Sequence, residues 1–110
     1  MSTIILVNQS QMGHGDAGLG RQILGNFLRK ISTIQDLEAI CLYNSGVQLA
    51  TRDSPVAGEL SLLHDNGVEI MACKTCVEHY AIGDRLIVEG PSSMDDIIAA
   101  MKRADKVISL

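Results

Sequence analysis

Two cysteines separated by two residues, Cys73 and Cys76, have the spacing of a pair that acts together in sulfur or metal chemistry. They follow a short apolar run, residues 68–72, and we expect a helix from Thr75 onward. A thiol at the start of a helix lies near unpaired backbone N–H groups and the positive end of the helix dipole, which favour the thiolate. Because the thiolate is both the nucleophile and the metal ligand, the pair predicts sulfur transfer, disulfide exchange or metal binding.

Each of these three chemistries needs different companions. His79 extends the pair to a possible metal-binding spacing, but a closed zinc site needs four ligands. Cys41 is a poor candidate for the fourth, because it lies in an apolar run where we expect it to be buried. A dithiol oxidoreductase also uses two cysteines at a helix start. A sulfur carrier needs one exposed, activated thiol, and the position of Cys73 before the helix fits that role.

The elements that must position the pair alternate between strands and amphipathic helices. Continuous apolar runs without alternation predict strands that are covered on both faces. The expected strands are residues 3–8, 38–43, 68–72, 86–88 and 106–110. The expected helices lie near residues 18–31, 54–67, 75–83 and 92–103. This order predicts a single α/β domain over residues 1–110, a three-layer α/β/α sandwich with a five-stranded, mainly parallel sheet.

The composition argues against two broad classes of partner. The formal net charge is −4 and the nine Lys and Arg residues are scattered, whereas nucleic-acid binding needs clustered cations. No apolar stretch approaches the roughly 20 residues that cross a bilayer. Residues 1–3 lead into an apolar strand without the features of a secretion signal. We therefore expect a cytoplasmic protein that binds neither nucleic acid nor membrane.

Polar loops follow the first two expected strands, at the sheet edge where parallel α/β proteins bind ligands. Residues 13–18 match the dinucleotide-binding pattern Gly-x-Gly-x-x-Gly, but Asn44 stands near the place where that pattern needs an acidic residue. We therefore expect a glycine-rich turn that holds no nucleotide. His14 and Asp16 in this loop would approach Cys73 if the first and third strands were neighbours.

Several short motifs occur in an order that covers essentially the whole chain. They are Met12-Gly13-His14-Gly15-Asp16, Leu19-Gly20, Tyr43-Asn44-Ser45-Gly46-Val47, Gly67-Val68-Glu69-Ile70, Cys73-x-Thr75-Cys76 and Ala104-Asp105-Lys106-Val107-Ile108. Together they resemble the DsrE/DsrF-like sulfur-relay family, most closely the C-terminal domain of YedF-type selenium-metabolism proteins. The resemblance implies a parallel α/β/α fold, homo-oligomers with cysteines near subunit interfaces, and relay of persulfide sulfur or selenium.

The resemblance also assigns roles within the cysteine pair. The family's reactive cysteine lies directly after the third strand, which corresponds to Cys73, with Cys76 as a resolving or second carrier thiol. Lys74 replaces the glycine that is usual inside the pair and adds a local positive charge. No TusA-like domain precedes the matching region, so we expect a TusA-like carrier, or another sulfur donor or acceptor, to act as a separate protein.

These observations predict a carrier that accepts a sulfane sulfur, or selenium, on Cys73 and passes it to a partner protein. The alternatives are a non-catalytic oligomeric module that binds a small anion or a metal, and a dithiol redox protein. We expect no resident metal and no organic cofactor. The expected binding residues, all in the loops after the strands, are Gly13, His14, Gly15, Asp16, Asn44, Lys74 and Thr75.

Overall fold

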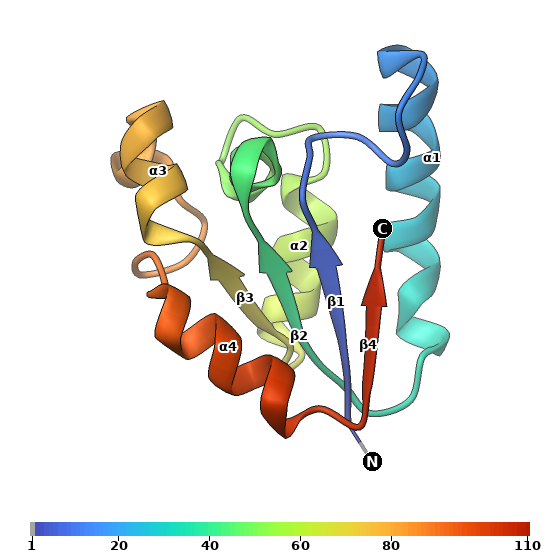
Figure 1. Cartoon of the computed structure of the whole chain (residues 1–110). Coiled ribbons are helices and arrows are strands. Elements are labelled where there is room, and N and C mark those ends of the chain that lie inside the picture. Colours follow the sequence, from blue (N-terminus) through green and yellow to red (C-terminus); the bar gives the residue numbers. More distant parts are fainter. Residues whose placement is uncertain (1) are drawn as a thin grey trace.

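A computed structural model describes residues 2–110 as three layers around one parallel sheet (Figure 1). The strands are β1 (Thr3–Val7), β2 (Leu37–Leu42), β3 (Glu69–Ala72) and β4 (Lys106–Ser109). The helices are α1 (Ala17–Lys30), α2 (Ala57–Asp65), α3 (Lys74–Tyr80) and α4 (Met94–Arg103), and the short 3₁₀ helices are η1 (Ile31–Thr33), η2 (Asn44–Ala50) and η3 (Gly83–Arg85). Helices α1 and α2 cover one face of the sheet, α4 crosses the other, and α3 stands beyond the end of β3.

The strands lie side by side in the order β3-β2-β1-β4, and every neighbouring pair is parallel. The two central strands, β1 and β2, are apolar on both faces because helices cover them on both sides. Ile4, Ile5 and Ile40 accordingly have no exposed surface. Because all four strands run in one direction, the loops after β1, β2 and β3 meet at one edge of the sheet.

The prediction of a fifth strand at residues 86–88 is wrong, and the described sheet has four strands. This segment lies outside the sheet, where it forms one isolated antiparallel bridge with Thr51. The Ile87 N–H donates to the Ala50 carbonyl at 2.8 Å, and Pro91 soon follows with no N–H to extend a ladder. The run is apolar because its side chains pack against the core from outside the sheet.

Side chains cap the starts of two helices, and a third helix begins one residue before the expected position. Asp16 caps α1, and its carboxylate accepts a backbone N–H from three residues further on at 2.7 Å. Ser93 caps α4 in the same way at 3.1 Å. Helix α3 begins at Lys74 and not at the expected Thr75, because Cys73 already occupies the N-cap position.

Gly46 in η2 lies so close to the end of β1 that a Cβ atom on it would clash with the Val7 carbonyl oxygen. The same carbonyl accepts the Tyr43 N–H at 3.1 Å. Only glycine fits this approach without displacing the backbone. The missing side chain therefore lets η2, which starts at Asn44, sit directly against the sheet edge.

Gly46→Ala should lower the free energy of unfolding by roughly 1–3 kcal/mol, the usual cost of overpacking. Gly58→Ala is the matched control, since Gly58 lies in α2 with open space where its Cβ would be. Alanine there should raise the free energy of unfolding by up to about 1 kcal/mol through its higher helix propensity. Urea unfolding measures both values, and a Gly46→Ala variant as stable as the wild type would contradict the close packing.

Cys41 lies in β2 with no exposed surface, as its apolar surroundings in the sequence predict. Its sulfur is 3.8 Å from the Met71 sulfur of β3. Burial raises the pKa of the Cys41 thiol to about 11, and the Glu69 carboxylate acts in the same direction. Cys41 is thus a neutral, buried side chain that serves the core.

The raised pKa of Cys41 should make the protein less stable in alkali. The folded state keeps a proton that the unfolded state, with a thiol pKa near 9.0, begins to lose. The stabilisation is therefore complete below pH 9 and declines between pH 9 and about 11, by up to roughly 1.4 kcal/mol per pH unit. Urea unfolding across this range measures the decline, which Cys41→Ala should lessen. An identical pH dependence in the two proteins would contradict this origin.

Candidate functional site

Cys73 is the first residue after β3 and the N-cap residue of α3, the place expected from the sequence. Its N–H donates to the Leu42 carbonyl at 2.9 Å, and its carbonyl accepts the Val77 N–H at 2.9 Å. These bonds hold Cys73 between the end of β2 and the first turn of α3. Its exposed fraction is only 3%, so the prediction that Cys73 presents an exposed thiol is wrong.

Part of this burial comes from the chain that leads into α4. The Ser92 N–H donates to the Ala72 carbonyl at 2.7 Å, and the Ser92 carbonyl accepts the Lys74 N–H at 2.9 Å. Ser92 thereby forms a single parallel bridge with Cys73 at the outer edge of β3. The segment that includes the expected fifth strand thus leads past Thr51 to the cysteine site instead of joining the sheet.

Cys76, in the first turn of α3, is half-buried and borders a surface hollow of about 440 Å³. We call this space the cysteine hollow. It is lined by residues from the end of β2, from α3 and from the start of α4, namely Tyr43, Asn44, Thr75, Cys76, His79, Tyr80 and Met94. A molecule in the cysteine hollow would therefore meet the Cys76 thiol and not the Cys73 thiol.

The backbone N–H of Asn44 donates to the Cys76 sulfur at 3.1 Å. Asn44 has a φ of 53°, in the left-handed region that asparagine adopts more readily than most residues. This turn, directly after β2, aims the Asn44 amide at the first turn of α3. Asn44 was expected as a binding residue, and the structure gives it a defined part, a backbone donor to sulfur.

The pKa of Cys76 is raised above its ordinary value, chiefly because burial withdraws water from the thiolate, and contact with the Cys73 thiol adds to the rise. The Asn44 N–H acts in the opposite direction, since a hydrogen bond to sulfur stabilises the charged form. The expectation that the helix start favours the thiolate therefore does not hold at Cys76. At neutral pH this sulfur is a thiol, and it must lose its proton before it attacks.

The expected approach of His14 or Asp16 to Cys73 is wrong, because β2 lies between β1 and β3. Both residues line a separate hollow of about 260 Å³ in the loop after β1, together with Gly13 and Gly15. The two glycines have φ values of 82° and 146°, which side chains rarely allow. The loop thus forms a glycine-rich turn, as expected, but away from the cysteine pair.

The other expected binding residues lie near the pair. Thr75, like Asn44, lines the cysteine hollow, whereas Lys74 is exposed and is not part of the lining.

Three lining residues were not expected from the sequence: Tyr43, Tyr80 and Met94. The position of Tyr43 at the carboxyl end of a buried strand was a signal that could have found it. Tyr80 and Met94 come together only through the path of the chain between α3 and α4. His79, which the sequence suggested only as a metal ligand, also lines the hollow, with its ring edge-on to Tyr80 at a centroid distance of 4.9 Å.

Among residues 2–110, no three His, Cys, Asp or Glu side chains come together as ligands for a metal ion, so the spacing of His79 with the two cysteines does not produce such a cluster. No helix in the same range is long and apolar enough to cross a membrane.

The whole chain, residues 1–110, matches the model of the DsrE/DsrF-like family, and the protein belongs to that family. This match confirms the resemblance that the short motifs suggested. None of the curated proteins matches the chain.

Two solved structures share the fold over nearly their full length. The YchN protein from E. coli is 20% identical, with a TM-score of 0.71 and all of both chains covered. MTH1491 from Methanobacterium thermoautotrophicum, a protein of unknown function, is 21% identical, with a TM-score of 0.71, 99% of this chain and 98% of its own chain covered. At identities this low, the similarity of the structures establishes a common fold and not a common chemistry.

Iodoacetamide should modify Cys76 before the other two cysteines, because Cys41 and Cys73 are buried. The rate should rise with pH around a midpoint above that of an ordinary thiol, since the pKa of Cys76 is raised. Cys73→Ala should lower this midpoint, because contact with the Cys73 thiol contributes to the rise. Peptide mass spectrometry after short exposures identifies the modified residue, and earlier labelling of Cys73 would refute the order.

Proposed function

We propose that this protein is a sulfur carrier that holds a sulfane sulfur on the Cys73–Cys76 pair and passes it to a partner protein. The observation that carries the proposal is the hydrogen bond of 3.1 Å from the Asn44 N–H to the Cys76 sulfur, at the edge of an open hollow. A fixed backbone donor stabilises negative charge that develops on a reacting atom. Membership of the DsrE/DsrF-like family, whose proteins commonly take part in sulfur relay, supports the same function.

Loading starts at Cys76, because its sulfur borders the hollow while Cys73 is buried. The Cys76 thiolate attacks the outer sulfur of a donor persulfide, R–S–SH. The S–S bond of the donor breaks, a new S–S bond forms on Cys76, and the donor leaves as the thiol R–SH after taking up the proton that Cys76 lost. His79, in the lining of the same hollow, is a residue that can relay this proton. The transfer needs no external oxidant.

The loaded sulfur then has two routes. In delivery, a thiolate of the acceptor protein attacks the outer sulfur and becomes a persulfide. The S–S bond to Cys76 breaks, and Cys76 returns to the thiolate. In release, Cys73 attacks the inner sulfur, so that a Cys73–Cys76 disulfide forms and hydrogen sulfide leaves. The release route uses the contact between the two thiols and ends in a disulfide that a reductant must open.

This assignment exchanges the two roles that the sequence suggested, in which Cys73 accepts the sulfur and Cys76 is the second thiol. The reason is access: a donor protein reaches a sulfur at the surface more easily than one with an exposed fraction of 3%. Cys73 still takes part in the reaction, as the buried thiol next to Cys76.

The proposed partners are a sulfur-donor protein and a sulfur-acceptor protein, with a TusA-like carrier as one candidate. The cysteine hollow is bordered by Tyr43, Tyr80 and Met94, residue types that are enriched in protein interfaces. We further propose a cytoplasmic homo-oligomer, as the family resemblance implies. Selenium would load by the same displacement at the same thiol.

Cys76→Ser should abolish persulfide loading, because it removes the accessible nucleophile. Cys73→Ser should load like the wild type and retain its sulfur longer, because release through the internal disulfide is blocked. Intact mass spectrometry after incubation with a cysteine desulfurase and cysteine measures the gain of one sulfur, which a reductant removes. Cys41→Ala, which changes a cysteine outside the site, is the control and should load normally.

The contrary outcomes separate the candidates. Loss of loading in Cys73→Ser, with normal loading in Cys76→Ser, would restore the roles suggested by the sequence and leave the carrier function intact. A wild type that loses two hydrogens and gains no sulfur would favour a dithiol redox protein, the second candidate, which the contact between the thiols supports. An unchanged mass would contradict both functions.

A further inference from the structure

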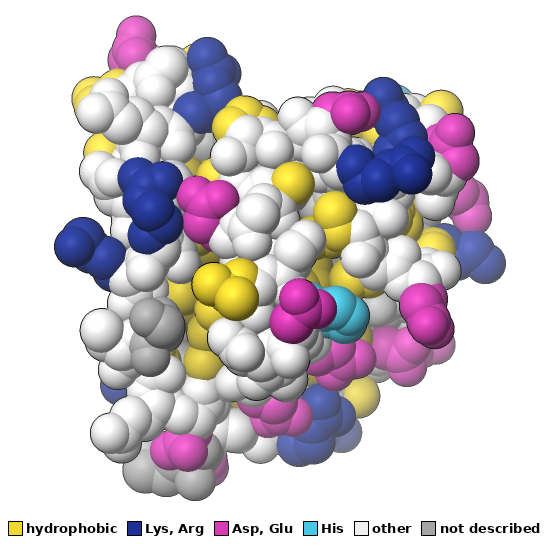
Figure 2. Space-filling model, turned by 180° about the vertical axis from the view of Figure 1, so that it is seen from behind, with side chains coloured by type: hydrophobic (Ala, Val, Ile, Leu, Met, Phe, Trp, Pro, Cys, Tyr) yellow, Lys and Arg dark blue, Asp and Glu magenta, His cyan; other side chains and the backbone are white. Residues whose placement is uncertain are grey.

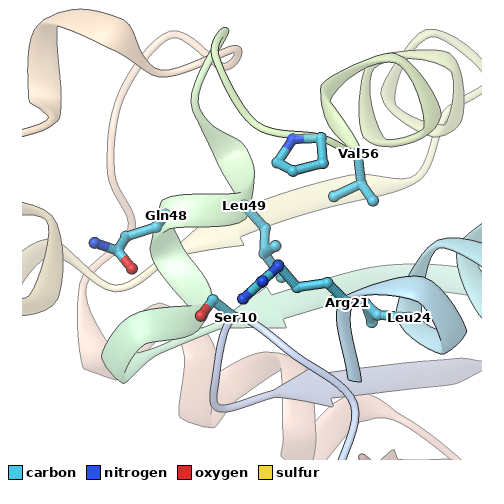
Figure 3. Close-up of a pocket in the computed structure, with 7 residues that line it drawn as sticks. Ser10, Arg21, Leu24, Gln48, Leu49 and Val56 are labelled. Atoms are coloured by element: carbon cyan, nitrogen blue, oxygen red, sulfur yellow. The ribbon is translucent and has the colours of Figure 1, made fainter. Parts of the chain in front are cut away.

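Another cavity shares no lining residue with the cysteine hollow or with the hollow after β1. It has a volume of about 200 Å³ and lies between α1, η2 and the chain that leads into α2 (Figure 3). It is lined by Ser10, Arg21, Leu24, Gln48, Leu49, Pro55 and Val56. We call it the Arg21 cavity.

The apolar part of the Arg21 cavity belongs to the core. Leu24, Leu49 and Val56 are exposed by only 1%, 5% and 4%, so their positions are set by packing and the cavity wall is rigid. Seen from behind, hydrophobic side chains gather in the furrow beside α1, with both basic and acidic side chains along its border (Figure 2). A wall of this kind favours an apolar group.

The cavity does not depend on a ligand for its shape. The Ser10 N–H donates to the Ser45 hydroxyl at 3.1 Å, which holds the loop after β1 against η2. Most small-molecule sites are likewise largely formed before the ligand binds, with apolar walls and a few placed polar groups.

Arg21 is the one charged residue among those described around this cavity. Its guanidinium extends toward Ser10, whereas the Gln48 amide points away from both (Figure 3). Three other arginines pair with carboxylates, but within residues 2–110 Arg21 forms no ion pair. A cation with its donors unpaired, next to an apolar wall, is suited to an anion that carries an apolar group.

We propose that the Arg21 cavity binds a small carboxylate with a short, unbranched aliphatic chain. The parallel N–H donors of the guanidinium match the two oxygens of a carboxylate, and Ser10 also lines the cavity. The aliphatic chain lies against Leu24, Leu49 and Val56. This site goes beyond sulfur carriage, and its ligand takes no part in the cysteine chemistry.

Size and charge both select this ligand class. A volume of about 200 Å³ is below the roughly 300–1,000 Å³ of pockets for drug-sized ligands. It equals the volume of roughly six or seven waters, which limits the aliphatic chain of the ligand to a few carbon atoms. A phosphate monoester would place up to two negative charges against one cation and an apolar wall. Arg21 is exposed and carries one positive charge, which the single charge of a carboxylate matches.

A titration of the full chain with acetate, butanoate and hexanoate, followed by the backbone amide NMR signals, tests the proposal. The signals of Ser10, Leu49 and Val56 should shift. Each methylene group that fits the wall should lower the Kd by roughly three- to four-fold. Arg21→Gln should weaken butanoate binding by roughly ten-fold or more, the effect expected when a charge-assisted hydrogen-bonded pair is lost.

Lys30→Gln is the matched control, because it removes the same charge from the exposed far end of α1 and should leave the Kd unchanged. A dispersed spectrum of each variant shows that it is folded. Equal binding to Arg21→Gln and wild type, a Kd that ignores chain length, or inorganic phosphate binding as tightly as butanoate would each overturn the proposal. So would the absence of any shift in the wild type. All of these outcomes are independent of persulfide loading.

Discussion

The contact between Gly46 and the end of β1 is the constraint on which the cysteine hollow and the Arg21 cavity depend. It lets η2 lie against the sheet edge, so that Asn44 at the start of η2 reaches Cys76 with its backbone N–H. Near the other end of the same short helix, Leu49 forms part of the wall beside Arg21. A position without a side chain thus sets the geometry of two chemically different sites, because a larger residue would push η2 away from both.

The central strands β1 and β2 could be predicted because their sequences reflect burial on both faces. Residues 3–8 and 38–43 are apolar without alternation, and strands buried on both faces produce this pattern. Residues 86–88 have a similar pattern for another reason, since they pack on the core from outside the sheet. Apolar character reports burial and not backbone pairing, so it cannot separate these cases. Strand order was also beyond reach, because parallel crossovers of one hand permit several orders.

The position of the cysteine site could be predicted from the sequence, but the burial of Cys73 could not. The position of Cys73 after a strand follows from the chain order, whereas its burial depends on Ser92, nineteen residues further along, which pairs beside it. The contact of Asn44 with Cys76 depends on a backbone turn that only the preference of asparagine for left-handed conformations hints at. His14 was grouped with the pair because nothing in the sequence reveals that a strand lies between them.

The bonds that cover Cys73 belong to no regular ladder. Residues 86–92 are attached to the rest of the molecule by two backbone hydrogen bonds made by Ser92, by one isolated bridge to Thr51 and by the packing of residues 86–88 on the core. Such a segment opens at a lower free energy than the sheet, because no strand or helix has to break with it. The reactivity of Cys73 therefore measures the population of a locally open form. Loosening the Ser92 attachment would increase that population.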